Sequence, residues 1–236
     1  MLYPIPFWNP DAEEAAVTAS VPSSPHIEYI AFRVGLKPAL RLAPGRGLAR
    51  ERTRAEAQGL ATRVRVGGSG RELLYIARDE RRATALSEAE ALSLCGTDAS
   101  IEGHRELGRL LGYPRCCVDA FVTRLADLQP QAHDASEDYL AVHDALGRTK
   151  IAHGRLNPTP RGGESTLISY YPCRFDCTLS LRYGEALFRK IAGRWPHRAD
   201  EIRRWLMEPV TLTAAGTRLP ADASSEGDVT LRFDAW

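Results

Sequence analysis

Four cysteines in two tight groups constrain this chain more than any other feature of its sequence. Cys116 and Cys117 are adjacent, and Cys173 and Cys177 are four residues apart. Each group closely follows a proline, a residue favoured at the first position of a helix. The sequence therefore predicts thiols at the starts of two helices, where unpaired N–H groups and the helix dipole favour thiolates over thiols.

The spacing within each group indicates how the thiolates could share one metal centre. If Cys173 and Cys177 lie on one helix, their side chains leave the same face one turn apart. Adjacent residues on a helix point about 100° apart, so we expect Cys117 to bind directly and Cys116 to face the open side. There Cys116 could act as an occasional fourth ligand or as a nucleophile. An iron–sulfur cube tolerates this spread better than a single ion, so a [4Fe–4S] cluster is the preferred cofactor.

Other uses of the cysteines stay open. A zinc ion held by all four sulfurs is the main alternative cofactor, although only the second group fits the usual C-x₂₋₄-C spacing of structural zinc sites. In that case the chain could be a carrier or sensor of zinc, copper or iron. A metal-free thiol oxidoreductase is a third hypothesis. The fifth cysteine, Cys95, follows an apolar helix end and is expected in the core.

Composition and charge exclude several classes of protein. The chain has 236 residues, 31 basic and 30 acidic, with a formal charge of +1. Such a balance creates no positive electrostatic field that would attract nucleic acid or an anionic membrane. No apolar run approaches the roughly 18 residues of a membrane span. The N-terminus does not resemble a signal peptide, so we expect a cytoplasmic protein with reduced thiols. The expected partner is a small-molecule substrate.

The pattern of apolar residues predicts an α+β fold, with short strands near both ends of the chain around a mainly helical middle that carries the cysteines. Residues 1–25 are expected to form an extended, proline-rich arm, and residues 26–236 a single domain. Residues 26–34 resemble a strand that pairs with residues 39–42. The other expected elements are strands at 64–68, 72–77, 165–171, 210–213 and 229–233, and helices at 49–60, 101–111, 136–147 and 198–207, with two more beginning at Pro114 and Pro172.

Four residues near the cysteines are candidates for catalysis by an open cluster iron. His104 lies on the apolar face of the helix that leads to Cys116, and histidine titrates near neutrality. Arg115 and Arg174 adjoin the cysteines and could bind a carboxylate or phosphate with two hydrogen bonds. Tyr171 could donate a hydrogen bond to substrate. Packing and solvation are the ordinary explanations for these side chains. Beside a cluster with an open iron, however, the four residues favour an enzyme of the sulfur-transfer, lyase or hydrolase type.

Two stretches of sequence resemble the domain of unknown function 483 family of archaea and bacteria. LGYPRCC at residues 111–117, followed by Phe121, is similar to that family's LGYPxCC, and PCRFDC at residues 172–177, followed by Ser180, is similar to its PCSxxC. The resemblance spans about residues 70–190 and implies metal-binding cysteines without implying a reaction. Tyr171 stands where the family has histidine, and Arg174 stands where it has serine.

Overall fold

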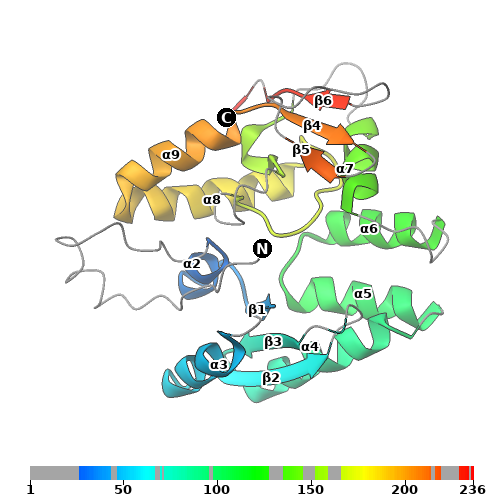
Figure 1. Ribbon diagram of the computed structural model, residues 1–236, viewed down its shortest axis with the longest axis vertical. Helices are drawn as coiled ribbons and strands as arrows, with labels where there is room; N and C mark the ends of the chain where they lie inside the picture. Colours follow the sequence, from blue (N-terminus) through cyan, green and yellow to red (C-terminus); the bar gives the residue numbers. More distant parts are fainter. Residues whose placement is uncertain are drawn as a thin grey trace.

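A computed structural model describes residues 27–43, 47–66, 70, 72–95, 98–127, 135–145, 152–158, 166–213, 216–218, 229–233 and 235–236. It confirms an α+β fold with a helical middle and strands near both ends (Figure 1). The predicted arm at residues 1–25 lies outside the described residues. The elements are α2 (Ile27–Arg33), β1 (Ala39–Leu42), α3 (Leu48–Ala57), β2 (Ala61–Val66), β3 (Glu72–Ala77), α4 (Glu80–Ser93), α5 (Asp98–Leu110), α6 (Arg115–Asp127), α7 (Ala135–Asp144), η2 (Gly154–Leu156), α8 (Thr178–Arg194), α9 (Pro196–Leu206), β4 (Val210–Thr213), β5 (Gly216–Arg218) and β6 (Val229–Leu231).

The first sheet has the strand order β1-β3-β2, and both pairings are antiparallel. Successive side chains of the central strand, β3, point to opposite faces of the sheet, as in any β-strand. Leu74 and Ile76 share a core with α2 and α3, whereas Leu73 and Tyr75 share a core with α4 and α5. The sheet is therefore covered on both faces, which explains why β3 is an almost unbroken apolar run.

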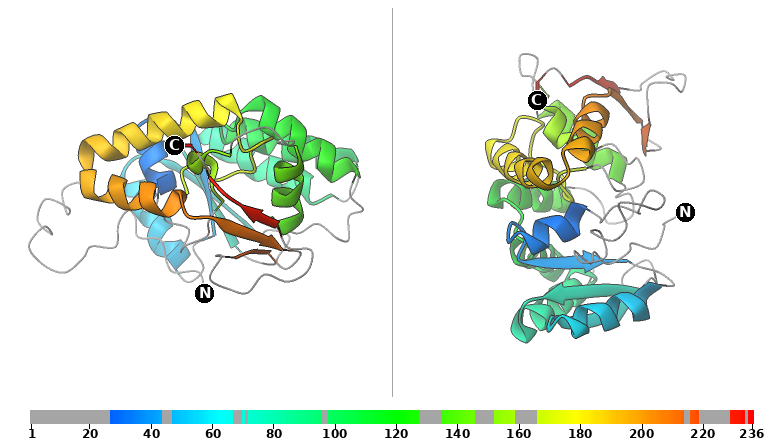
Figure 2. Two further views of the ribbon diagram at one scale, coloured as in Figure 1. Left: turned by 90° about the horizontal axis from the view of Figure 1, so that it is seen from above. Right: turned by 90° about the vertical axis from the view of Figure 1, so that its left-hand side faces the viewer.

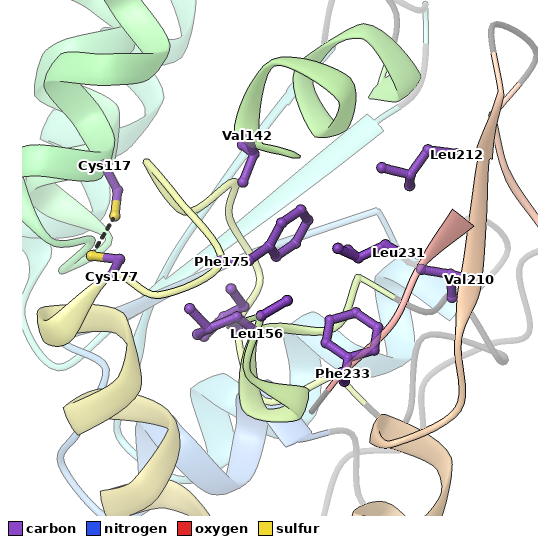
Figure 3. Packing of buried hydrophobic residues seen from close by; sticks show 11 residues of the cluster. Cys117, Val142, Leu156, Phe175, Cys177, Val210, Leu212, Leu231 and Phe233 are labelled. Atoms are coloured by element: carbon purple, nitrogen blue, oxygen red, sulfur yellow. Dashed lines mark hydrogen bonds between the residues drawn. The ribbon is translucent and has the colours of Figure 1, made fainter. Parts of the chain in front are cut away.

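The second sheet has the order β5-β4-β6 and belongs to the other half of the chain. Its buried residues Val210, Leu212 and Leu231 form one core with Val142 of α7 and Leu156 of η2. Figure 3 shows this core, with two of the cysteines at its edge. All four cysteines thus belong to this second core or pack against it.

Helix α2 joins the two halves and corrects a prediction, because residues 26–34 were expected to form a strand. Ile27 and Ile30 pack against α8 and α9, while Tyr29 and Phe32 pack against the first sheet. Figure 2 shows α2 between the sheet and these two helices. A short helix buried on two sides is apolar nearly all round, so its sequence also fits the alternation of a strand.

Residues 166–171 correct a second prediction, since they form bends where a strand was expected. The segment contributes Leu167 and Ile168 to two different cores. Strand β1 is present as predicted, but its partner is β3. Within the described part of the chain, no helix combines the length and the apolar character that crossing a membrane requires.

Candidate metal centre

The first cysteine pair lies in the first turn of α6, where the sequence predicts it. Helix α5 ends at Leu110, and Gly112 follows with a φ of 79°, in the left-handed region that glycine adopts most readily. The carbonyl of Pro114 then accepts hydrogen bonds from the backbone N–H groups of Cys117, at 2.9 Å, and Val118, at 3.1 Å. These bonds start the new helix and hold both thiols of the pair at its N-terminal end.

The second pair is arranged differently from the prediction, because Cys173 and Cys177 do not share a helix. Helix α8 begins at Thr178, with Cys177 as its N-cap residue, and Cys173 lies in the preceding turn. Within that turn Phe175 is completely buried in the core of the second sheet. Burying this ring bends the chain before a helix can begin, and the bend places Cys173 beside Cys177.

The structure brings all four thiols together. Their Sγ atoms lie within 4.8 Å of one another, and Cys177 Sγ is 3.7 Å from both Cys116 Sγ and Cys117 Sγ. The adjacent pair, Cys116 and Cys117, is 3.9 Å apart, so both thiols face the same point despite their neighbouring positions. Figure 3 shows the sulfurs of Cys117 and Cys177 directed at each other. Four soft donors at these distances can hold a metal ion.

Burial within the centre is unequal. Cys117 and Cys177 are buried, whereas Cys116 and Cys173 are partly exposed, with Cys116 on the outer side. The centre therefore has one protected side and one side that faces solvent. Cys95 is not part of it and is exposed, so the prediction that it lies in the core was wrong.

The pKa values of the three clustered thiols Cys117, Cys173 and Cys177 are shifted in opposite directions by their contacts with one another and by burial. Hydrogen bonding with Cys173 and Cys177, followed by burial, raises the pKa of Cys117. The Cys117 hydrogen bond lowers the pKa of Cys173, but Cys177 and burial outweigh it and raise the pKa to about 12. Donation from Cys117 and Cys173 lowers the pKa of Cys177. One thiolate thus forms readily, and a bound cation would compensate the charge of the others.

A hydroxyl network supports the buried side of the centre. Ser180 Oγ lies 3.2 Å from Cys117 Sγ, and the hydroxyl of Tyr170 donates to Ser180 Oγ at 3.1 Å. The backbone N–H of Cys173 also donates to Cys117 Sγ at 3.3 Å. Sequence reasoning missed these supporting roles of Tyr170 and Ser180. Ser180 is three residues after Cys177, in the first turn of α8. This spacing places both side chains on one face of the helix, and it could have indicated the role of Ser180 from the sequence.

A cavity of about 240 Å³ adjoins the centre, and Cys117 forms part of its wall. Two predicted site residues also line it: the rings of His104 and Tyr171 both contact Phe121, at centroid distances of 5.5 Å and 6.0 Å. The structure does not bring the two predicted arginines into this wall. The Arg115 side chain is 94% exposed, and Arg174 pairs with Asp176 at 3.0 Å.

Comparisons with known proteins add no information about this site. A scan against protein-family models gives no match, and searches of curated proteins and of solved structures give no significant match either. The resemblance to the domain of unknown function 483 family therefore stays a prediction from the two cysteine motifs. The arrangement of the thiols carries the functional argument.

Proposed function

We propose that this chain is a metal-binding protein whose four cysteines hold a single tetrahedral ion, zinc, which ties the start of α6 to the start of α8. The spacing of the thiols carries the proposal. A zinc–sulfur bond of about 2.3 Å gives sulfur–sulfur distances of about 3.8 Å around a tetrahedral ion. The separations of 3.7, 3.7 and 3.9 Å among Cys116, Cys117 and Cys177 agree with that value.

The same spacing supports a single ion over the cluster that the sequence favoured. Each thiolate of a four-iron cube binds a different iron, so neighbouring sulfurs are roughly 6 Å apart. The four Sγ atoms here lie within 4.8 Å of one another, and they would have to separate to enclose a cube. A complete set of four thiolates is also typical of structural zinc sites.

An iron–sulfur enzyme is the second candidate, because a cavity adjoins the centre. Cys117 lines that cavity together with His104 and Tyr171, as a substrate pocket beside an open iron would require. The partial exposure of Cys116 also suits a centre that exchanges one ligand. When bound, such a cluster would supply a Lewis-acidic iron.

Metal analysis of the purified protein distinguishes the two candidates. The protein should be prepared without oxygen and analysed for zinc, iron and inorganic sulfide. We expect a colourless protein with one zinc ion per chain. A brown protein with several irons and matching sulfide would support the enzyme, and iron without sulfide would indicate a single iron ion in the same thiolate site.

Substitution of single cysteines tests whether these residues hold the metal. Cys173→Ser and Cys177→Ser should each abolish stoichiometric metal binding, because each removes one of the four thiolates. Cys95→Ser is the matched control and should keep its metal, since Cys95 is exposed and lies outside the centre. Full metal occupancy in the first two variants would contradict the proposed site.

A further inference from the structure

The cavity beside the metal centre has a polar end formed by an ion pair. Arg41 of β1 donates from Nε to one carboxylate oxygen of Glu90 at 2.6 Å and from Nη2 to the other at 2.8 Å. Both residues line the cavity. The Glu90 side chain is 4% exposed and that of Arg41 is 39% exposed. A buried carboxylate thus holds the guanidinium in one orientation at the cavity wall.

This ion pair keeps hydrogen-bonding capacity for a ligand. The pair uses Nε and Nη2 of Arg41, so Nη1 takes no part in it. A carboxylate offers about four lone-pair sites. Arg41 occupies two of those on Glu90, and the Tyr75 hydroxyl interacts with the same carboxylate, which leaves about one site for a ligand. The cavity wall therefore presents a donor and an acceptor side by side, on two groups whose charges cancel.

The rest of the wall is mostly apolar and rich in aromatic rings. Tyr113 and Tyr170 pack together at a centroid distance of 4.7 Å, and Phe121 and Tyr171 stack with an interplanar angle of 6°. Aromatic rings favour flat ligands that stack or pack edge to face. The volume, about 240 Å³, is below the roughly 300–1,000 Å³ of pockets that enclose drug-sized molecules. One ring or two fused rings would therefore suit it.

The local charge argues against an anionic ligand. Glu90 already neutralises Arg41, and the nearby Lys37, which lies over the Tyr113 ring at 5.3 Å, is neutralised by Glu28. A second anion at Arg41 would meet the buried carboxylate of Glu90. A neutral group that accepts from Arg41 and donates to Glu90 satisfies both partners without that repulsion.

We propose that this cavity binds a small, uncharged ring compound with a lactam edge, in which a carbonyl and a ring N–H are adjacent, as in purine and pyrimidine bases. The carbonyl accepts from Arg41 and the ring N–H donates to Glu90, while the ring packs among the aromatic side chains. This inference goes beyond the proposed zinc site and does not depend on which metal the thiolates hold.

Calorimetric titration of the metal-loaded protein with two ligands that differ by one methyl group tests the inference. Hypoxanthine offers the lactam edge, whereas 1-methylhypoxanthine keeps the carbonyl and lacks the neighbouring N–H. We expect hypoxanthine to bind about tenfold more tightly or better, because the methylated ring leaves the Glu90 acceptor unpaired. Uracil should also bind, and benzoate, a flat anion of similar size, should bind more weakly than hypoxanthine.

A variant of the protein tests the same hydrogen bond by changing Glu90 and not the ligand. Glu90→Gln keeps the size of the side chain but removes the carboxylate, and it should weaken hypoxanthine binding about tenfold. Arg63→Gln is the control, because it breaks the exposed Arg63–Glu80 pair, and neither of these residues lines the cavity. If Glu90→Gln fails to fold, the comparison of the two ligands on the unmodified protein still decides the question.

Three results would overturn the inference: no binding of hypoxanthine or uracil, equal binding of hypoxanthine and its methyl derivative, or tighter binding of benzoate. Zinc should be measured in the same samples. Failure of ligand binding with one zinc per chain contradicts only the cavity inference. Loss of zinc with intact ligand binding contradicts only the proposed metal site.

Discussion

The hydroxyl of Ser180 shows how a single uncharged group can influence the metal centre. It lies between the Tyr170 hydroxyl and Cys117 Sγ, and groups that support metal ligands in this way typically contribute 10–100-fold in affinity. We expect Ser180→Ala to keep one metal per chain but to bind it about tenfold more weakly in competition with a chromophoric chelator. Ser100→Ala, which removes a hydroxyl bonded to the Ser93 carbonyl, should not change the affinity.

The adjacent cysteines are expected to behave alike, which differs from the sequence-based expectation of unequal roles. Both Cys116 Sγ and Cys117 Sγ lie 3.7 Å from Cys177 Sγ. Serine at either position should therefore reduce the metal content by a similar amount, measured as metal per chain after gel filtration. Cys95→Ser again provides the control. Retention of full metal by Cys116→Ser alone would restore the earlier view that this thiol faces an open site.

At the scale of elements, the turn between α5 and α6 depends on one glycine. Gly112 and Gly35 both have a φ of 79°, but a Cβ on Gly112 would lie 2.5 Å from Pro38 Cδ, whereas a Cβ on Gly35 would meet nothing within 4 Å. Gly35→Ala should cost about 1–2 kcal/mol of unfolding free energy, the penalty of a left-handed residue. Gly112→Ala adds an overpacking penalty of about 1–3 kcal/mol. Urea unfolding of the two variants measures the difference, and equal losses would contradict the role of the Pro38 contact.

The elements that the sequence predicted well are those fixed by local signals. The predicted helix start at Pro114 is within one residue of the start of α6 at Arg115, and the predicted strands at 64–68 and 72–77 correspond to the antiparallel pair β2 and β3. Helix α2 was missed because packing on two sides removes the polar stripe that identifies a helix. The start of α8 was missed because burial of Phe175 in a core from distant strands delays it.

The candidate site was predictable only where its residues form motifs. The four cysteines stand out by their grouping, and the structure brings them together. Arg41 and Glu90 are 49 residues apart on a strand and a helix, and neither sits in a recognisable pattern. Only the packing of α4 against the first sheet makes them neighbours, so no local signal could have indicated the polar end of the cavity.

At the scale of the whole molecule, Lys37 links the two halves. This buried side chain pairs with Glu28 of α2 and donates to Ser169 Oγ at 2.8 Å. Burial alone would lower the pKa of Lys37, but Glu28 outweighs burial and raises it. A raised pKa stabilises the fold at pH values below the ordinary lysine pKa, and this contribution is lost only as the pH rises through the higher folded value. The ion pair is therefore complete at neutral pH.

Removing this lysine should destabilise the protein at pH 7. Lys37→Met removes the buried cation that pairs with the Glu28 carboxylate, and breaking a buried ion pair in this way costs about 3–5 kcal/mol. Urea unfolding measures the loss. The double variant Lys37→Met with Glu28→Gln should recover part of it, because it also removes the buried negative charge of Glu28. A double variant no more stable than Lys37→Met would show that packing of the lysine, and not its charge, holds the halves together.

Metal removal should lower the stability of the entire fold, because the thiolates come from the start of α6 and the start of α8. A ligand that binds only the folded state at about 1,000 times its Kd contributes about 4 kcal/mol, and for a chain of this length that corresponds to a fall in Tm of about 10 °C. Thermal unfolding with and without a strong chelator measures the shift, and added zinc should restore it. Cys177→Ser should melt at the temperature of the chelated protein and should not respond to the chelator. A Tm that is unchanged by chelation, in protein shown to have lost its metal, would mean that the thiolate centre does not contribute to the stability of the fold.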